Sequence, residues 1–580
     1  TDDRIKDAIK NAGPNTGSGE TEDAGYELMT RLGEALVPVV DRFGEASADT
    51  ILTTITRIAE NDRRAAFVLI RECPDILRKL LDADAEAVPT VFDTTGQMIP
   101  FGAALAVRFL EVSPSLLSSN NIEILTRTAA LGCSIAEVNS QAAISVVGQS
   151  PAIIHRIGFD GLRQVSAFAA ATAHASRAHS IKVVEESPFR IDRMLEAGAE
   201  RRSCLTVYHL ASLMARDDYS IAMDLVAKMP DIIGAPAIRG QAGLLTMLFD
   251  HAQNASSFGA RLAYIFLDTA PALIDRLGPD DAEDFWQCAF AMAKDNPENA
   301  VTLLSKSPEI LEQLQRCFST KRTATIFHLG RKLSSFSSRA ALRFIRTSTE
   351  LADRLDDDGL LQISETAGEM AGLSQTTAVT FLDIAPAILD KSGMEGLMKT
   401  AALGIHTAKQ SWETADRLLL RSPDLIDRLG FDGLKMIGDF ASALARESLS
   451  AALGLLDKCP SIIDGLLKLG DRSLVTSVCH LGGRIVKYNA RMALSLLNRS
   501  PEIIRQIGFE GLEKIEDMAH RIGMESWTTA VSLLETSPAI IERVGYAGLE
   551  EIAALARLVA RQHIYGDVRI IDKSTDLIDH

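Results

Sequence analysis

A chain of 580 residues would form roughly three to five ordinary globular domains, or one array that grows by adding repeated units. Its content of 47% hydrophobic, 24% charged and only 5% aromatic residues is typical of a helical protein and excludes a disordered or collagen-like chain. The net charge of -17 repels nucleic acid and anionic lipid, and no apolar run approaches the roughly 20 residues of a membrane span. We therefore expect a protein partner, with no nucleic acid and no membrane span.

The seven cysteines contain no Cys-x-x-Cys pair and cannot form the dense disulfide framework of a small secreted domain. Cys73 and Cys459 stand before a repeated proline, and the other five fall in helical segments. We expect them to be small core residues in a reducing compartment. No signal sequence opens the chain, so the expected location is cytoplasmic.

The first residues differ from the rest of the chain. Residues 1–12 can form a brief polar helix, and the stretch from Gly13 to Gly19 has the composition of a flexible tether. The sequence therefore predicts an N-terminal polar segment and tether over residues 1–25, followed by a repeat array over residues 26–580.

A Ser-Pro dipeptide or a close variant recurs along the array and marks one position in each repeat, here called the anchor. Thirteen prolines occupy the anchor, Thr349 and Thr575 stand where two more are due, and the intervals run from 36 to 42 residues. The anchor prolines are Pro38, Pro74, Pro114, Pro151, Pro188, Pro230, Pro271, Pro308, Pro386, Pro423, Pro460, Pro501 and Pro538.

The residues around Pro423 predict how a repeat folds. Ser422 can cap a helix whose first residue is Pro423, and Gly430 can end that helix after about two turns. Asp432 can cap a second helix with apolar residues at three- and four-residue spacing. A third helix would lead into the next anchor. This pattern predicts three helices in each repeat.

An alanine recurs eight residues before the anchor in twelve repeats, and an apolar residue lies four residues before the anchor. A small side chain at a fixed place lets neighbouring helices approach closely, so that each unit stacks on the last. The predicted fold is all-α, an α-solenoid of about fourteen HEAT/armadillo-like repeats of 36–42 residues, with an incomplete last repeat from Ser574. The alanines are at positions 66, 106, 143, 222, 263, 300, 341, 378, 415, 452, 493 and 530.

The sequence lacks the common motifs of catalysis. It has no phosphate-binding loop, no H-E-x-x-H and no G-x-S-x-G. We predict a protein that is not an enzyme, with no catalytic residues, no cofactor and no metal ligands. An enzyme with a new site in the groove is a further hypothesis, but the polar positions are spread along the repeat instead of converging on one pocket.

Histidines form the one polar pattern worth weighing. They lie 21 residues before the anchor in three repeats, and carboxylates occupy the same column in others. One interpretation is a stripe on the second helix that binds a partner, with a dependence on protonation. The alternative is that the histidines cap or brace the longer loop of these repeats. The candidate partner-binding stripe comprises His209, Asp250, His328, Glu365, Asp439 and His480.

Two phrases carry a family resemblance: Ser411-Trp412-Glu413-Thr414-Ala415 and Ser526-Trp527-Thr528-Thr529-Ala530, each followed by a Leu-Leu pair and Ser-Pro. They resemble the helical-repeat region of bacterial von Willebrand A-domain proteins that partner MoxR-type AAA+ ATPases. The A-domain itself is not expected here, because the nearest match to its metal-binding Asp-x-Ser-x-Ser motif begins at Asp572 and reads as a helix cap. The resemblance implies a scaffold that docks onto other proteins.

Together these patterns predict a non-catalytic scaffold for protein–protein interaction, with an extended acidic solenoid surface. The acidic balance favours a basic segment as the partner. The alternative that the resemblance implies is a regulatory or targeting subunit of an AAA+ ATPase or metalloenzyme assembly.

Overall fold

The computed structural model describes residues 20–119, 122–351, 354–561 and 571. All regular structure in these residues is helical, with α-helices, two short 3-10 helices and no strand, which confirms the predicted all-α class. The chain divides into two compact units, Thr1–Ala282 and Glu283–His580.

The helices follow one another with short connections. The first unit contains α2 (Glu20–Phe43), α3 (Glu45–Asn61), α4 (Arg63–Asp84), η1 (Ala85–Ala87), α5 (Val88–Met98), η2 (Ile99–Phe101), α6 (Ala103–Ser119), α7 (Ile122–Ala136), α8 (Ser140–Ala173), α9 (Arg177–Glu196), α10 (Arg201–Met214), α11 (Tyr219–Ile233), α12 (Ala242–Ser256) and α13 (Ala260–Leu277). Helix α14 (Pro279–Asp295) contains the boundary, between Ala282 and Glu283. The second unit continues with α15 (Pro297–Ser305), α16 (Ser307–Cys317), α17 (Thr320–Ser334), α18 (Ser338–Leu351), α19 (Asp357–Leu373), α20 (Gln375–Ala408), α21 (Trp412–Glu447), α22 (Leu449–Leu467), α23 (Arg472–Val486), α24 (Ala490–Gly523) and α25 (Trp527–Arg561).

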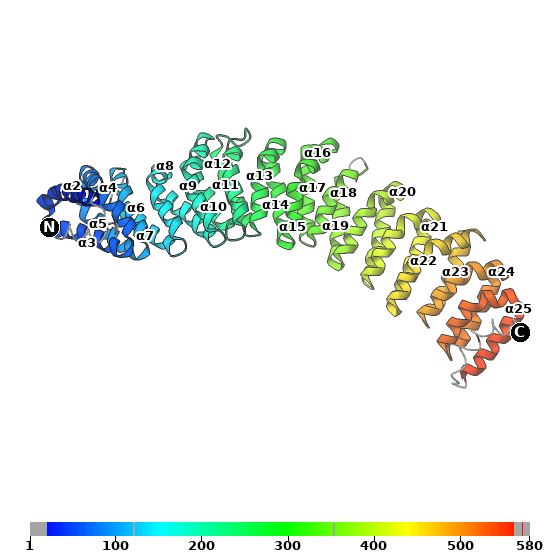
Figure 1. Ribbon diagram of the computed structural model, residues 1–580. Helices are drawn as coiled ribbons and strands as arrows, with labels where there is room; N and C mark the ends of the chain where they lie inside the picture. The colour runs from blue at the N-terminus through cyan, green and yellow to red at the C-terminus, as the bar shows by residue number, and fades with distance from the viewer. Residues whose placement is uncertain (1–19, 120–121, 352–353, 562–570, 572–580) are drawn as a thin grey trace. The chain divides into compact units, whose positions relative to one another are not determined.

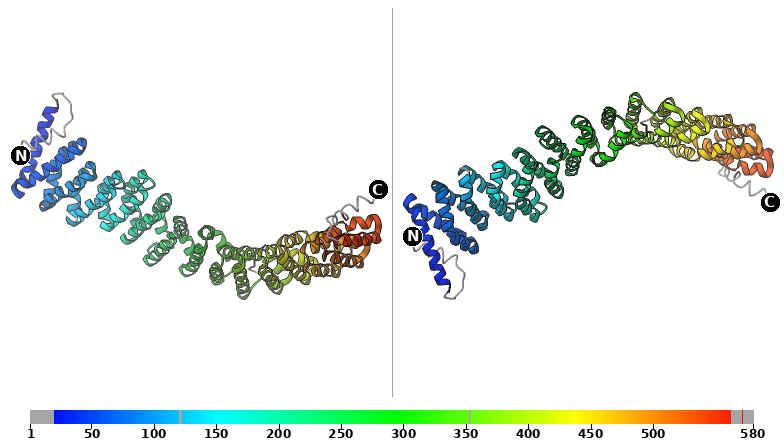
Figure 2. Two further views of the ribbon diagram at one scale, coloured as in Figure 1. Left: turned by 90° about the horizontal axis from the view of Figure 1, so that it is seen from below. Right: turned by 90° about the horizontal axis from the view of Figure 1, so that it is seen from above.

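Within each unit the helices pack mainly against those one or two places along the chain (Figure 1). In the first unit, α8 packs against α7, α9 and α10; in the second, α20 packs against α18, α19 and α21. Figure 2 shows this order from two further sides, with helices that are neighbours in the sequence lying side by side within each unit. The core of each unit is therefore built by local stacking.

In thirteen repeats a helix begins directly after the residue twelve places before the anchor, which is Ser, Asn or Asp in eleven of them and Gly in two. Ser411 accepts a hydrogen bond from the backbone N–H of Thr414 (3.1 Å), and Asn489 accepts two, from Arg491 (2.9 Å) and Met492 (3.1 Å). Ser, Asn and Asp side chains satisfy the free N–H groups at a helix start, which is why this position begins a helix. The residues at this position are Asp62, Gly102, Asn139, Ser176, Asp218, Gly259, Asn296, Ser337, Ser374, Ser411, Ser448, Asn489 and Ser526.

The helix that begins at this cap continues through the anchor, so the prediction that Ser-Pro starts a helix is wrong. Twelve of the thirteen anchor prolines lie inside an α-helix, Pro423 within α21 among them. The exception is Pro308, which lies in the first turn of α16. The predicted first and third helices are consequently one helix, and three helices per repeat is corrected to two.

A serine hydroxyl explains how the proline is tolerated inside the helix. Proline has no N–H, so Pro423 cannot donate to the carbonyl of Leu419 four residues earlier. The buried Ser422 donates its hydroxyl to that carbonyl instead (2.7 Å). The same bond recurs before Pro151, Pro501 and Pro538, at 2.7–3.0 Å. Serine before proline is also a helix-cap pattern, so the sequence alone did not separate the two roles.

Each repeat has two helices, here called the A helix, which contains the anchor, and the B helix, which follows it. In six repeats a glycine seven residues after the anchor divides the two. Gly430 has a φ of 76°, which confirms the predicted end of a helix at this residue. Helices α8, α20, α21, α24 and α25 each contain an A and a B helix joined at such a glycine. Gly433 lets the start of the B helix lie close to the Leu429 side chain, since a Cβ at Gly433 would lie 2.2 Å from Cβ of Leu429.

The alanine column is confirmed as a packing position. All twelve alanines eight residues before the anchor have 0% of their surface exposed, as Ala415 does. The residues four positions before the anchor, such as Leu419 and Leu534, are buried as well. Because interiors are close-packed, this column fixes how closely an A helix approaches its neighbours.

The start of α2 at Glu20 lies six residues before the predicted start of the array at residue 26. The predicted polar helix and tether over residues 1–19, and the incomplete last repeat from Ser574, lie outside the described residues. Among the described helices, none is long and apolar enough to cross a membrane.

Candidate partner-binding surface

All residues of the predicted stripe lie on B helices. In the first unit, His209 on α10 is half-buried and Asp250 on α12 is exposed, and α10 packs against α12. In the second unit, the four members are exposed and lie on α17, α19, α21 and α23: His328, Glu365, Asp439 and His480. None of the six side chains forms a hydrogen bond or ion pair with another residue in the described part of the chain. The stripe is therefore open to an external ligand, and its role stays a hypothesis.

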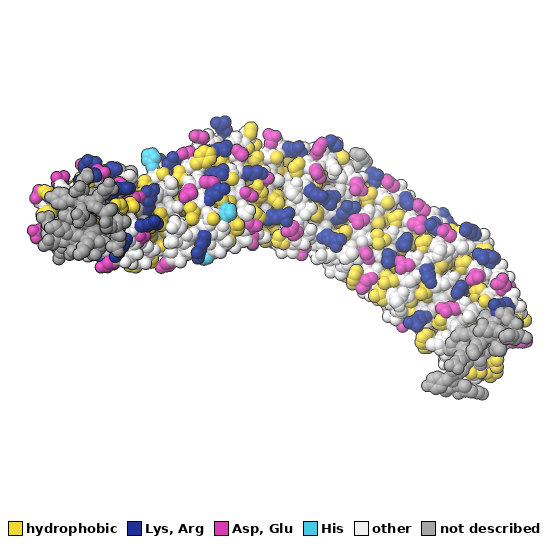
Figure 3. Space-filling model, in the orientation of Figure 1, with side chains coloured by type: hydrophobic (Ala, Val, Ile, Leu, Met, Phe, Trp, Pro, Cys, Tyr) yellow, Lys and Arg dark blue, Asp and Glu magenta, His cyan; other side chains and the backbone are white. Residues whose placement is uncertain are grey.

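The charge around the stripe is mixed. Lys435 lies four residues before Asp439, and Arg484 four residues after His480, a spacing that places each pair on one helix face. On the face drawn in Figure 3, acidic and basic side chains are interspersed. The negative net charge of the chain is thus not gathered into one block on that face.

The described residues offer little for catalysis. No group of three or more His, Cys, Asp or Glu side chains among them is placed to hold a metal ion. Burial raises the pKa of the thiols of Cys73, Cys204, Cys288 and Cys459 to about 12, so these thiols are protonated and inert near neutral pH. These four fit the prediction of core cysteines, whereas Cys317 is exposed at the end of α16.

Each unit has at least one open hollow with a mainly polar lining. One of about 500 Å³ between α3 and α5 is lined by Arg57, Asp93 and Gly96, and Asp93 lies in the same column as the stripe. One of about 310 Å³ in the second unit is lined by Lys458, Asn498 and Glu535 from α22, α24 and α25. Such hollows can take up polar side chains of a partner.

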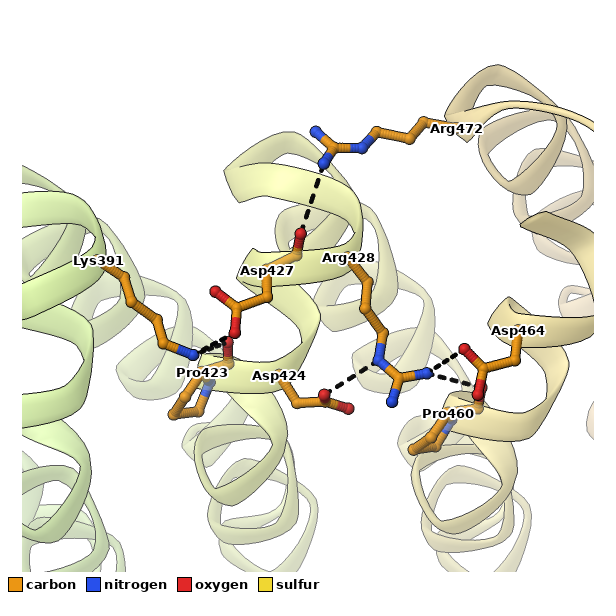
Figure 4. A network of polar contacts seen from close by, with 8 residues as sticks. All are labelled: Lys391, Pro423, Asp424, Asp427, Arg428, Pro460, Asp464 and Arg472. Atoms are coloured by element: carbon orange, nitrogen blue, oxygen red, sulfur yellow. Dashed lines mark hydrogen bonds and ion pairs between the residues drawn. The ribbon is translucent and has the colours of Figure 1, made fainter. Parts of the chain in front are cut away.

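The sequence interpretation missed a ladder of ion pairs that joins successive A helices. The Arg428 guanidinium donates to Asp424 in its own helix (3.0 Å) and, in the next repeat, to the Pro460 carbonyl (3.3 Å) and Asp464 (Figure 4). The rule is a cation five residues after one anchor and a carboxylate four residues after the next.

The same rule holds at other steps. One repeat before Arg428, Lys391 donates to the Pro423 carbonyl (3.1 Å) and pairs with Asp427. In the first unit, Arg156 pairs with Asp192 (2.7 Å). The 36-residue spacing between cation and carboxylate is the signal that could have revealed the ladder. These carboxylates are engaged in holding repeats together, unlike those of the stripe.

A second missed feature is the turn between the B helix of one repeat and the A helix of the next. In the second unit, six consecutive turns of this kind carry a large apolar side chain with 38–68% of its surface exposed. In the first unit, Phe101 is the one such residue in the corresponding described turns. The residues in the second unit, here called the apolar edge, are Phe336, Leu373, Trp412, Leu449, Tyr488, Met524 and Trp527.

Comparison with known proteins does not identify a relative. No protein-family model, curated protein or solved structure matches this chain. The resemblance to von Willebrand A-domain proteins accordingly stays a hypothesis that rests on the repeated phrases alone.

Proposed function

We propose that this chain is an α-solenoid of HEAT/armadillo-like repeats that acts as a non-catalytic scaffold for protein partners. The recurrence of caps, anchors and ladder contacts at fixed positions supports a repeat array, because each repeat contacts mainly its neighbours. Extended surfaces of stacked helices commonly serve to hold partners. The buried thiols, all free, fit a reducing, cytoplasmic setting.

The observation that carries this proposal is the contrast between two sets of recurring carboxylates. Asp427 and Asp464 are paired with cations of the adjacent repeat, so their place in the repeat is structural. Asp250, Glu365 and Asp439 are exposed, occupy one column of the repeat, and have no partner among the described residues. Unpaired carboxylates at one position of the repeat suit a partner that presents Lys or Arg side chains.

The test compares two variants of equal charge. Asp250→Asn, Glu365→Gln and Asp439→Asn together neutralise the stripe. The matched control neutralises three exposed carboxylates outside the stripe that have no partner among the described residues: Asp275→Asn, Asp432→Asn and Glu551→Gln. Partners are captured by cross-linking to the native chain, identified by mass spectrometry, purified and titrated against all three proteins.

We expect the stripe variant alone to lose affinity and to show a flatter dependence on ionic strength, since exposed charges are screened within about 8 Å at physiological salt. Equal affinity of the stripe and control variants would remove the stripe from the interface. Failure to find any saturable protein partner would refute the scaffold itself.

A further inference from the structure

The apolar edge has a charge opposite to that of the whole chain. In the six repeats concerned, we take the segment from eighteen to eight residues before the anchor, which covers the end of the B helix, the turn and the start of the A helix. These segments contain nine Lys and Arg residues against four Glu, although the chain has a net charge of -17. The segments are residues 331–341, 368–378, 405–415, 442–452, 483–493 and 520–530.

Contacts between adjacent repeats show that neighbouring turns of the edge lie close together. The ring of Phe336 reaches α19, where a Cβ at Gly368 would lie 3.4 Å from it. Further along, Arg446 donates to the Gln410 side chain of the preceding turn (3.2 Å). Each turn can thus add to a single extended surface.

The last two turns of the edge also touch. The ring centroids of Tyr488 and His520 are 4.3 Å apart, and the Arg491 guanidinium lies 5.8 Å from the ring centroid of Trp527. Aromatic and cationic side chains are therefore interleaved, and Tyr488 and Trp527 keep 59% and 44% of their surface exposed. Rings held in this way offer a firm apolar contact at small entropic cost.

Several cations of the edge have no internal partner. Lys332, Arg339, Lys409 and Lys487 are exposed and form no ion pair with another described residue. Cations on the A helices, such as Arg428, are engaged in the ladder instead. Free cations beside exposed aromatic and aliphatic side chains are complementary to a ligand that carries carboxylates and apolar groups together.

We propose that the apolar edge of the second unit binds an extended acidic segment of a partner protein, with an apolar side chain at about every third residue. Packed helices lie about 8–10 Å apart, and three residues of extended chain span about 10 Å, so one apolar side chain can meet each turn. Six turns would accommodate about 15 residues. This inference rests on the proposed scaffold function but not on the stripe, which favours a basic partner.

Single-stranded nucleic acid also combines negative charge with flat apolar groups. Two observations favour the peptide. The edge contains Glu369, Glu413, Glu447 and Glu525, which would oppose a continuous row of phosphates, and the remainder of the chain is strongly acidic. An acidic peptide can place its carboxylates only where the edge is basic.

The test uses a fluorescent peptide of fifteen residues with Leu at every third position and Asp or Glu elsewhere, and measures its binding by anisotropy. Competitors are the same peptide with Lys replacing the acidic residues, and a single-stranded DNA of fifteen nucleotides. One edge variant reverses three charges (Lys332→Glu, Lys409→Glu, Lys487→Glu) and a second removes two rings (Trp412→Gln, Tyr488→Gln). The control reverses three exposed lysines off the edge (Lys79→Glu, Lys458→Glu, Lys468→Glu).

We expect saturable binding of the acidic peptide, weakened about tenfold by either edge variant and within about twofold of native in the control. Neutralising the stripe should leave this binding unchanged. No saturable binding, equal loss in edge and control variants, or stronger binding of the DNA would each overturn the inference. If the acidic peptide fails while a captured partner still depends on the stripe, the edge proposal is refuted and the proposed function stands.

Discussion

The role of the serine before the anchor can be tested with a double-mutant cycle at Ser422 and Pro423. The structure indicates that the Ser422 hydroxyl replaces the N–H that Pro423 lacks, and so satisfies the buried carbonyl of Leu419. If this is correct, the serine matters only while proline follows it. The four proteins required are the native chain, Ser422→Ala, Pro423→Ala and the double variant.

The expected magnitude follows from what each change leaves at the Leu419 carbonyl. With Pro423 present, Ser422→Ala leaves this carbonyl without a donor, which costs about 1–3 kcal/mol, reduced by about 0.5 kcal/mol because alanine favours the helix. With alanine at 423, a backbone N–H can donate to the same carbonyl, so the serine change should cost about 0–0.5 kcal/mol. The coupling energy should therefore be about 1–2 kcal/mol.

Hydrogen exchange of the amides in α21 is the suitable assay, because an array can open locally before it unfolds as a whole. Ser422→Ala should speed exchange in the turn around Leu419 about tenfold with proline present, and little with alanine present. Ser187→Ala is a matched control, since the Ser187 hydroxyl donates to the carbonyl of Val183 (2.5 Å) and not to the carbonyl four residues before Pro188. Equal effects of Ser422→Ala in both backgrounds would refute the proposed substitution of hydroxyl for N–H.

Two further predictions concern charged side chains. Arg428→Ala should destabilise the contact between α21 and α22 by about 1 kcal/mol. Arg428→Lys should destabilise it by less, because Lys391 makes the equivalent contacts one repeat earlier. Urea melts at low and high salt should show a loss of stability that shrinks as salt rises. Burial raises the pKa of Glu516 above its ordinary value despite its pairing with Arg484. Between the ordinary pKa and the raised pKa, the folded chain therefore holds a proton that the unfolded chain releases. The free energy of unfolding consequently falls as pH rises through this range. Glu516→Gln should remove this part of the pH dependence and add about 1 kcal/mol at neutral pH, and a destabilised variant in thermal melts across pH 4–8 would contradict it.

Much of the fold could be predicted from the sequence because the periodic apolar residues are unambiguous. The alanine column and the glycine after the anchor have direct steric consequences, and both are confirmed at Ala415 and Gly430. The helix count was wrong for a local reason. Ser422 and Pro423 satisfy the rules for a helix start and also the rules for a proline inside a helix, and periodicity cannot separate the two. The better start signal is Ser411, which caps α21 eleven residues upstream of Ser422.

The surface was harder to predict because its features depend on contacts between repeats. The column of the stripe could be found by counting from the anchor, but its exposure and lack of partners required coordinates. The ladder partners lie 36 residues apart, so neither side chain alone indicates the pair. The apolar edge was missed because the phrases that contain Trp412 and Trp527 were interpreted only as a family resemblance, and the sequence does not show which side chains of a turn stay exposed.

The repeat also separates structural polar residues from those available to partners, and this separation has a physical basis. A polar side chain on an A helix lies near the equivalent position of the next A helix, so a cation and a carboxylate at the ladder positions satisfy each other, as Arg428 and Asp464 do. The six stripe side chains have no such complement among the described residues, and several edge cations have none either. Substitutions at the stripe therefore leave the ladder intact, and so do substitutions of edge cations such as Lys332, Lys409 and Lys487, which form no ion pair with another described residue. The exposed side chains can therefore differ from one stretch of the chain to another, as those of the apolar edge in the second unit differ from those of the corresponding described turns in the first.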